Sequence, residues 1–122
     1  MRADGTIDEC IFCKIVRGEI PAQKVYEDEL VLAFNDIKAQ APLHVLVVPK
    51  VHIESLDEAT AEHCTTLGRM LGVAPRIARE NGSPDGFRAI INNGRIGRQD
   101  VMHVHLHVVG GHDRLGPMLS RA

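Results

Sequence analysis

The chain has few aromatic side chains, with no Trp, one Tyr and three Phe among 122 residues. Its core must therefore be built from Val, Ile, Leu and Ala. It also lacks an apolar run long enough to cross a membrane, and residues 1–5 show no signal-peptide core. We therefore expect a cytosolic protein with no membrane partner.

A strong excess of charge is also absent, because 14 basic residues stand against 16 acidic ones. A long nucleic acid held by charge is therefore not expected, whereas a small phosphorylated ligand is compatible with this balance. Three cysteines, two of them in Cys10-Ile11-Phe12-Cys13, do not make a secreted disulfide framework. They suggest free thiols or a metal site in a reducing compartment.

A chain of this length suits one domain, residues 1–122. Hydrophobic periodicity gives its elements in outline. It predicts a short helix over 11–16, a hairpin with strands at 23–26 and 30–34, an apolar and therefore central strand over 43–49, a long amphipathic helix from 55 to a stop at 81–86, and a strand over 87–92. Pro75 lies inside the long helix and predicts a kink rather than an end, since the apolar stripe resumes at Ile77.

Three histidines alternate with apolar residues in the stretch Met102-His103-Val104-His105-Leu106-His107-Val108-Val109. Period two is the strand period, so this fifth strand should present imidazoles on one face and hydrocarbon on the other. Residues two apart on a strand face are separated by roughly 6.5–7 Å, so the three rings can line one groove. A single histidine is more often a hydrogen-bonded core residue, but three in register favour a functional site.

The loop before this strand, residues 92–100, contains two glycines, three side-chain amides and two arginines. Glycines let backbone N–H groups converge on an anion, and amides and guanidinium groups donate further hydrogen bonds. Such loops are more often simple turns, but the position beside the histidines favours a phosphate cradle. Imidazole beside a bound phosphate suggests covalent catalysis, in which the neutral ring attacks phosphorus and water then cleaves the phosphohistidine.

These residues resemble the histidine-triad (HIT) superfamily, in particular its Hint branch, over nearly the whole chain. The resemblance is carried by His103-x-His105-x-His107, Gly97-Arg98-Gln99, Gly110-Gly111, Ile11-Phe12-x-Lys14-Ile15, Gly18-Glu19-Ile20-Pro21, Leu32-Ala33-Phe34-x-Asp36-Ile37 and His44-x-Leu46-Val47-Val48-Pro49-Lys50-x-His52-Ile53. It implies an α+β fold, a five-stranded antiparallel sheet with one long and one short helix, and a homodimer.

The resemblance also implies a nucleotide hydrolase or transferase, typically a purine nucleoside phosphoramidase that releases AMP from a P–N bond through a nucleotidyl-histidine intermediate. His105 would be the nucleophile. His107 and His44 would support the phosphate and the leaving group, and His103 would complete the triad. Asp36 would bind the ribose hydroxyls, which suits an acceptor-only carboxylate. The other implied nucleotide contacts are Asn92 and Gln99 at the α-phosphate and Ile11, Phe12, Ile15, Phe34 and Ile37 around the base.

Two positions depart from the family pattern. Asp100 stands where the family usually carries Ser or Thr, whose hydroxyl donates to the phosphate, and a carboxylate there would repel it. His112 replaces an arginine that is frequent after the glycine pair. These departures concern the preference for a leaving group rather than the class of reaction.

Some family members with a Cys-x-x-Cys pair hold a structural zinc ion, which here would be bound by Cys10, Cys13, His52 and His103. Two thiolates and two imidazoles make a closed tetrahedral set. The alternative is a pair of buried free thiols on a short helix. Cys64, on the long helix, is expected in the core.

Other functions stay open at this point. The chain could be an AMP-binding regulatory or scaffold protein with little turnover, or a dinucleoside polyphosphate hydrolase. It could also be a metal hydrolase that uses His103, His105 and His107 as ligands. The expected ligand is a purine nucleotide such as AMP or an AMP phosphoramidate, and the covalent mechanism needs no cofactor.

Overall fold

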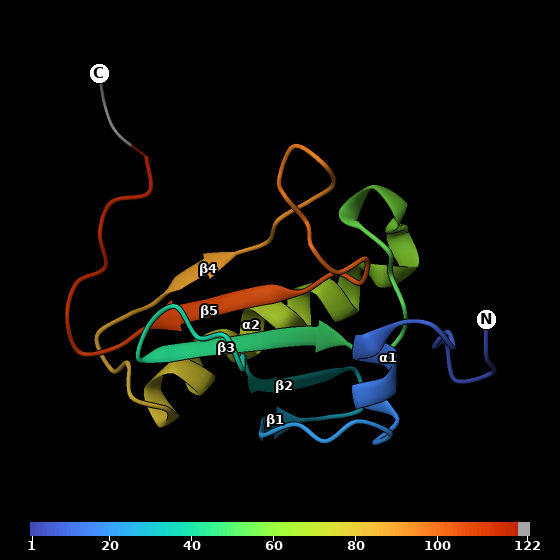
Figure 1. Cartoon of the computed structure of the whole chain (residues 1–122), viewed down its shortest axis with the longest axis horizontal. Coiled ribbons are helices and arrows are strands. Elements are labelled where there is room, and N and C mark those ends of the chain that lie inside the picture. Colours follow the sequence, from blue (N-terminus) through green and yellow to red (C-terminus); the bar gives the residue numbers. More distant parts are fainter. Residues whose placement is uncertain (120–122) are drawn as a thin grey trace.

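The computed structural model describes residues 1–119, which form a five-stranded sheet with helices on both faces (Figure 1). The elements are α1 (Ile11–Val16), β1 (Lys24–Glu27), β2 (Val31–Asn35), β3 (Leu43–Pro49), η1 (Leu56–Glu58), η2 (Ala61–His63), α2 (Cys64–Glu80), β4 (Arg88–Ile90) and β5 (Leu106–Gly110). The strand order is β1-β2-β3-β5-β4, and every neighbouring pair is antiparallel. The expected α+β fold is confirmed, although residues 120–122 of the expected domain lie outside the described part.

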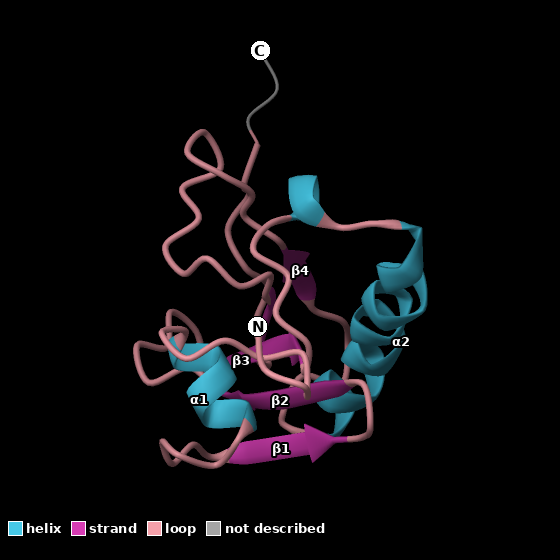
Figure 2. Cartoon of the chain, turned by 90° about the vertical axis from the view of Figure 1, so that its right-hand side faces the viewer, coloured by secondary structure: helices cyan, strands magenta, loops and turns pink. Residues whose placement is uncertain are grey.

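The two helices cover opposite faces of the sheet, as the edge-on view in Figure 2 shows. Each face has its own apolar cluster, because side chains alternate between the faces along a strand. The α2 face is the larger and consists of Val31, Ala33, Leu43, Val45, Val47, Ile53, Met70, Val73, Ala74, Ile77, Ala78, Val104, Leu106 and Val108. The α1 face consists of Cys10, Phe12, Cys13, Ile15, Leu32, Phe34, Leu46 and Val48.

Strand β3 is buried at all seven positions and pairs with β2 on one side and β5 on the other. A strand that is covered on both faces needs apolar side chains at nearly every position, which is the reason for its continuous hydrophobic run. The sequence-based prediction of a central strand over 43–49 is therefore confirmed.

The long helix begins later than expected, at Cys64 rather than Ser55. Residues 56–63 instead form two short 3₁₀ turns, and the second is capped by a hydrogen bond from the Thr60 backbone N–H to Nδ1 of His63 (3.0 Å). Cys64 is exposed at the start of the helix, so its expected place in the core is wrong. The helix continues through Pro75 and ends at Glu80, directly before the expected stop at 81–86.

Strand β5 also begins later than the alternating pattern predicts, at Leu106 rather than Met102. The segment before it has no ladder hydrogen bonds with β3 or β4, but its side chains still alternate. Val104, Leu106 and Val108 are buried against α2, while Met102 at the start of the pattern is 45% exposed. No helix among residues 1–119 is long and apolar enough to cross a membrane.

Candidate functional site

A cavity of about 380 Å³ opens between α1, the end of β2 and the histidine segment. Apolar side chains form most of its wall, and two imidazoles, His105 and His107, face into it. Eight residues that the sequence assigns to nucleotide binding or catalysis line it: Ile11, Phe12, Ile15, Phe34, Asp36, Ile37, His105 and His107. The shape and the lining suit a flat apolar base with a phosphate at the histidine end.

The backbone orients His105 so that one ring nitrogen is left bare. Its Nδ1 lies 2.8 Å from the carbonyl oxygen of His103, and a carbonyl can only accept, so Nδ1 must donate its N–H. The neutral ring therefore carries its lone pair on Nε2. The ring of Phe12 packs edge-on against this imidazole, with 5.2 Å between centroids, and holds its plane. This is the arrangement that a nitrogen nucleophile needs.

His44 and His107 form a hydrogen-bonded pair whose direction can be derived. The backbone N–H of Gln40 donates to Nδ1 of His44 (3.0 Å), so the proton of this imidazole must be on Nε2. That N–H donates to Nδ1 of His107, 2.9 Å away. The proton of a neutral His107 is then on Nε2.

Nε2 of His107 is the one buried side-chain nitrogen or oxygen in residues 1–119 that has no hydrogen-bond partner. Burial, together with the neighbouring His105 and His44 rings, lowers the pKa of His107, so the ring is neutral at pH 7. Its Nε2–H is therefore a desolvated donor with nothing to donate to. Because the His105 and His107 ring centroids are 5.1 Å apart, this donor lies beside the His105 ring.

Asp100 lies at the same end of the cavity, with Oδ1 3.4 Å from Nε2 of His105. Its side chain is 77% exposed, whereas that of His105 is 2% exposed. The Asp100 carboxylate therefore lies beside the His105 ring, and its expected effect on phosphate binding stays a prediction. Its charge opposes an anionic ligand unless the side chain turns into solvent, which its exposure permits.

The loop over 92–100 is held mainly by its own hydrogen bonds. The Gln99 side chain accepts from the N–H of Gly94 (2.9 Å) and donates to the carbonyls of Glu54 (2.8 Å) and Val101 (2.9 Å). Neither Gln99 nor Asn92 lines the cavity. Their expected contacts with the phosphate stay predictions, and the Gln99 amide stabilises the loop that carries Asp100.

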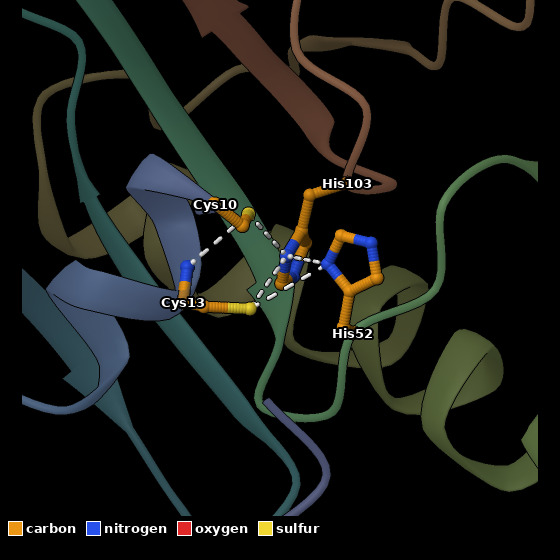
Figure 3. Close-up of side chains that lie close together, drawn as sticks. All are labelled: Cys10, Cys13, His52 and His103. Carbon is orange, nitrogen blue, oxygen red and sulfur yellow. Dashed lines mark hydrogen bonds between the residues drawn. The ribbon is translucent and has the colours of Figure 1, made fainter. Parts of the chain in front are cut away.

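A second group of side chains meets at the N-terminal end of α1. Cys10 and Cys13 come from the start of this helix, His52 from the segment after β3, and His103 from the segment before β5 (Figure 3). Their ligand atoms all lie within 4.8 Å of one another. The predicted set of metal ligands is therefore brought together by three distant parts of the chain.

The distances within this cluster fit a tetrahedral zinc site. The S···N separations are 3.2, 3.5 and 3.6 Å, and the two Nδ1 atoms are 3.3 Å apart. Zinc bonds of about 2.3 Å to sulfur and about 2.05 Å to nitrogen give tetrahedral edges of roughly 3.3–3.8 Å. Nε2 of His103 donates to the carbonyl of Pro49 (2.9 Å), which points the lone pair on Nδ1 at the cluster.

Burial raises the pKa of the Cys13 thiol to about 11 and lowers the pKa of His103 to about 4. Both shifts describe the side chains without an ion, and a cation among them would reverse the preference of the thiols for their protonated form. Both ring nitrogens of His103 are directed away from the nucleotide cavity. Its link to the cavity is its backbone carbonyl oxygen, which orients the His105 ring.

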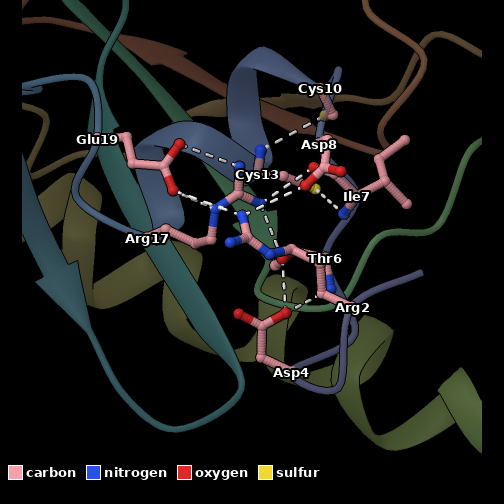
Figure 4. A network of polar contacts seen from close by, with 9 residues as sticks. All are labelled: Arg2, Asp4, Thr6, Ile7, Asp8, Cys10, Cys13, Arg17 and Glu19. Atoms are coloured by element: carbon pink, nitrogen blue, oxygen red, sulfur yellow. Dashed lines mark hydrogen bonds and ion pairs between the residues drawn. The ribbon is translucent and has the colours of Figure 1, made fainter.

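A polar network behind the cluster fixes the N-terminal segment (Figure 4). Arg17, at the end of α1, donates to Thr6 Oγ1 (2.8 Å), to the carbonyl of Ile7 (3.0 Å) and to Glu19 (2.6 Å). The Ile7 N–H in turn lies 3.5 Å from Sγ of Cys13. Sequence patterns gave no signal for these contacts, because two of the groups belong to the backbone.

The alternative of a metal hydrolase with the three triad histidines as ligands can be compared with the geometry. In residues 1–119 the groups of side chains close enough to share a metal ion are Cys10, Cys13, His52 and His103, and separately Asp36, His44 and His107. The triad members His103, His105 and His107 do not form such a group. A metal hydrolase that uses the triad as its ligands is therefore not supported.

The fold and the histidine arrangement define a HIT domain, and the HIT domain family model matches residues 17–114. The chain belongs to the HIT family. It is 49% identical over 114 residues to the purine nucleoside phosphoramidase of Escherichia coli K12, covering 93% of this chain and 95% of that protein. It is 48% identical over 103 residues to a 14 kDa zinc-binding protein of Zea mays, covering 83% and 80%. A HIT family hydrolase from Clostridium thermocellum superposes with a TM-score of 0.87 at 38% identity, covering 93% of this chain and 100% of that one.

Proposed function

We propose that the protein is a HIT-type hydrolase that cleaves purine nucleoside 5′-phosphoramidates and releases AMP, with residues 1–122 forming one HIT domain. The observation that carries this proposal is the pair of nitrogens at the phosphate end of the cavity. Nε2 of His105 has a free lone pair, and Nε2–H of His107 is a buried donor without a partner in residues 1–119. A nucleophile beside an unused donor suits attack on a phosphorus atom.

The reaction proceeds in two displacements. Nε2 of His105 forms a bond to phosphorus while the P–N bond breaks, and the departing amine takes up one proton. Water then attacks the nucleotidyl-histidine, releases AMP, restores the bare Nε2 and returns one proton to the solvent. His107 stabilises the phosphoryl oxygens through its Nε2–H in both steps, and the His103 carbonyl keeps the His105 proton on Nδ1 throughout.

The rest of the cavity suits the nucleoside. Phe12 and Phe34 pack edge to face with 5.7 Å between ring centroids and form a firm apolar floor. Ile37 is 96% exposed at the mouth, where a base can cover it. Asp36 supplies carboxylate oxygens for the ribose hydroxyls.

A panel of substrates tests the proposal. Wild-type protein should hydrolyse adenosine 5′-phosphoramidate at least about tenfold faster than a diadenosine polyphosphate, because the polyphosphate adds negative charge beside Asp100. Guanosine phosphoramidate in the same panel measures the preference for the base. Tight AMP binding without turnover of any member would instead identify a regulatory or scaffold protein.

We also propose one structural zinc ion per chain, bound by Cys10, Cys13, His52 and His103. The tetrahedral distances and the orienting hydrogen bond from His103 to Pro49 support it. The ion would join three separate segments and hold α1 over the base site, with the nucleophile left free. None of the three cysteines forms a disulfide, which suits the expected cytosolic location.

Metal analysis of protein purified without added zinc should give about one equivalent per chain, and a Cys10→Ser/Cys13→Ser variant should give almost none. Chelation should lower the thermal stability before it lowers the intrinsic rate. Less than a tenth of an equivalent in both proteins would mean that the two thiols are packing residues.

A homodimer completes the proposal. Among residues 1–119, β4, a strand of three residues, lies at one end of the sheet and pairs only with β5, and Leu71 on helix α2 is 53% exposed. An open edge and an exposed apolar side chain favour pairing with a second copy. Light scattering at micromolar concentration should give twice the chain mass, and a monomeric mass would contradict this part of the proposal.

A further inference from the structure

We propose that Asp36 is a positioning residue that couples recognition of the ribose to the hydrogen-bond donor at the phosphate. The inference rests on the proposed function for its substrate, but its geometry is independent of the reaction. Oδ2 of Asp36 lies 3.4 Å from Nε2 of His44, the nitrogen whose N–H donates to His107. A residue that binds the sugar therefore also contacts the histidine pair that serves the phosphate.

The backbone fixes Asp36 in this place. Its N–H donates to the carbonyl of His44 (2.9 Å), which ties it to β3, and its Oδ1 accepts the N–H of Lys38 (2.9 Å). Only Oδ2 is then left to face the histidine. The side chains of Asp36 and His44 are 19% and 5% exposed, so water weakens the contact little.

One proton faces two acceptors at this point. Because Nδ1 of His44 accepts from Gln40, the single proton of the neutral ring is on Nε2. It can be donated to Nδ1 of His107 at 2.9 Å or attracted by Oδ2 of Asp36 at 3.4 Å. A carboxylate is the stronger acceptor, so it weakens the His44–His107 hydrogen bond while its own lone pairs are unoccupied.

A bound ribose removes this competition. Its two hydroxyls donate to the carboxylate, and the His44 N–H is then donated fully to His107. A stronger hydrogen bond at Nδ1 of His107 polarises the ring and makes its Nε2–H a stronger donor to the phosphate. The donor at the reaction centre is therefore strengthened only when the correct sugar is bound.

The same three side chains are close enough for a metal ion, but their spacing favours the hydrogen bond. His44 Nε2 and His107 Nδ1 are 2.9 Å apart. Two imidazoles on a tetrahedral zinc ion would be separated by roughly 3.3 Å.

The kinetic test compares the phosphoramidates of adenosine and 2′,3′-dideoxyadenosine. For the wild-type protein, loss of the hydroxyls should lower kcat about fivefold in addition to raising KM, since one weakened hydrogen bond is worth about that factor. In Asp36→Asn, the neutral amide competes only weakly with His107 for the His44 N–H. The value of kcat should therefore be the same for both substrates within about twofold. Asn35→Ala, at the neighbouring residue whose side-chain amide donates to Gln23 (3.2 Å), should keep the wild-type ratio of kcat values. If the hydroxyls change only KM in the wild-type protein, Asp36 binds the sugar and does nothing more.

A second readout does not depend on hydrolysis. Histidine ring ¹⁵N shifts are recorded with saturating adenosine or saturating 2′,3′-dideoxyadenosine, neither of which carries a phosphate. Adenosine should move the Nδ1 signal of His107 toward a stronger hydrogen bond, dideoxyadenosine should not, and Asp36→Asn should abolish the difference. Equal shifts with both nucleosides, or none with either, would overturn the coupling. A failure of the substrate panel would leave this measurement intact, so the two proposals can fail separately.

Discussion

The two faces of the sheet use the same strands in different ways. Along β3, the odd positions Leu43, Val45 and Val47 pack against α2 in a purely apolar cluster. The even positions face α1, where His44 shares the surface with Leu46 and Val48. The histidine segment alternates likewise, with Val104, Leu106 and Val108 on the α2 face and His103, His105 and His107 on the other.

The difference between the two faces separates the side chains that stabilise the fold from the histidines that face the cavity. Apolar side chains on the α2 face stabilise the fold through burial alone. They form no hydrogen bonds that would fix the position of a proton. On the α1 face the ring nitrogens of His44 and His103 and Nδ1 of His105 have partners that fix which nitrogen carries the proton, whereas Nε2 of His107 has none among residues 1–119. Substitution of an apolar side chain on the α2 face should therefore lower the stability, and substitution of a histidine that faces the nucleotide cavity should lower the rate.

The largest effect is expected at His105. Replacement by Asn or by Ala removes the nucleophilic nitrogen, so turnover should fall at least about a thousandfold, equivalent to about 4 kcal/mol in the barrier. AMP binding should persist, because Phe34, Ile37 and Asp36 are unchanged. Single-turnover rates and calorimetry measure the two quantities separately. Ordinary turnover in both variants would remove His105 from the mechanism.

The matching change on the α2 face is Leu106→Ala. Leu106 is 1% exposed and adjoins His105 in sequence, so its truncation leaves a cavity and should lower the free energy of unfolding by about 3 kcal/mol. The rate per folded molecule should change less than about threefold. Ile96→Ala, at a side chain 83% exposed, is the control and should leave the stability nearly unchanged. A large loss of rate in Leu106→Ala would mean that the two faces are not separable.

A smaller effect is expected at Asp28, which closes the hairpin between β1 and β2. Burial opposes its ionisation, but hydrogen bonds from Tyr26, from the N–H groups of Leu30 and Val31, and from Arg69 outweigh burial and hold its pKa well below the ordinary value. A lowered pKa in the folded state stabilises the protein above the unfolded pKa, and this contribution is lost as the pH falls toward the folded value.

Asp28→Asn should therefore cost about 1–2 kcal/mol at pH 7, and the difference from wild type should shrink below about pH 4. Urea titrations at several pH values measure it. Asp8→Asn is the control, because its side chain is 78% exposed and its ion pair with Arg2 is long, at 3.5 Å. A difference that grows on acidification would contradict the assignment.

The smallest effect concerns Asp100. Replacing it by Ser removes a charge near the phosphate position, so AMP should bind about two- to fivefold more tightly, as expected for an exposed charge in water. Calorimetry at low and high salt checks both the gain and its screening. Asp85→Ser, outside the nucleotide cavity, should change nothing. Unchanged or weaker affinity would mean that the Asp100 carboxylate turns away from the ligand.

Hydrophobic periodicity predicted which residues form helices and strands, but it placed the start of some of these elements incorrectly. Helix α1 and strand β3 have the predicted bounds. Leu56 and Ala59 fit the helical spacing, but they lie in and beside a 3₁₀ turn, so the start of α2 was placed nine residues too early, at 55 instead of 64. The histidine alternation predicted the correct faces even though the first part of it is not a paired strand, because an extended chain alternates with or without ladder hydrogen bonds.

The histidines proposed to be catalytic could be picked out in the sequence, but the positions of their protons could not. The proton positions depend on the N–H of Gln40 and the carbonyls of Pro49 and His103, and every residue type offers such backbone groups. The contact between Asp36 and His44 likewise arises because the residue directly after β2 is hydrogen-bonded to strand β3. Only the three-dimensional structure brings these groups together.

Rapid-quench mass spectrometry shows whether His105 becomes covalently nucleotidylated. Wild-type protein mixed with adenosine phosphoramidate and quenched in alkali, where a phosphohistidine survives, should carry one adenylyl group that maps to His105 and disappears at the rate of AMP release. His105→Asn should show no adduct. Full turnover with no adduct at any quench time, or an adduct on another residue, would contradict the mechanism.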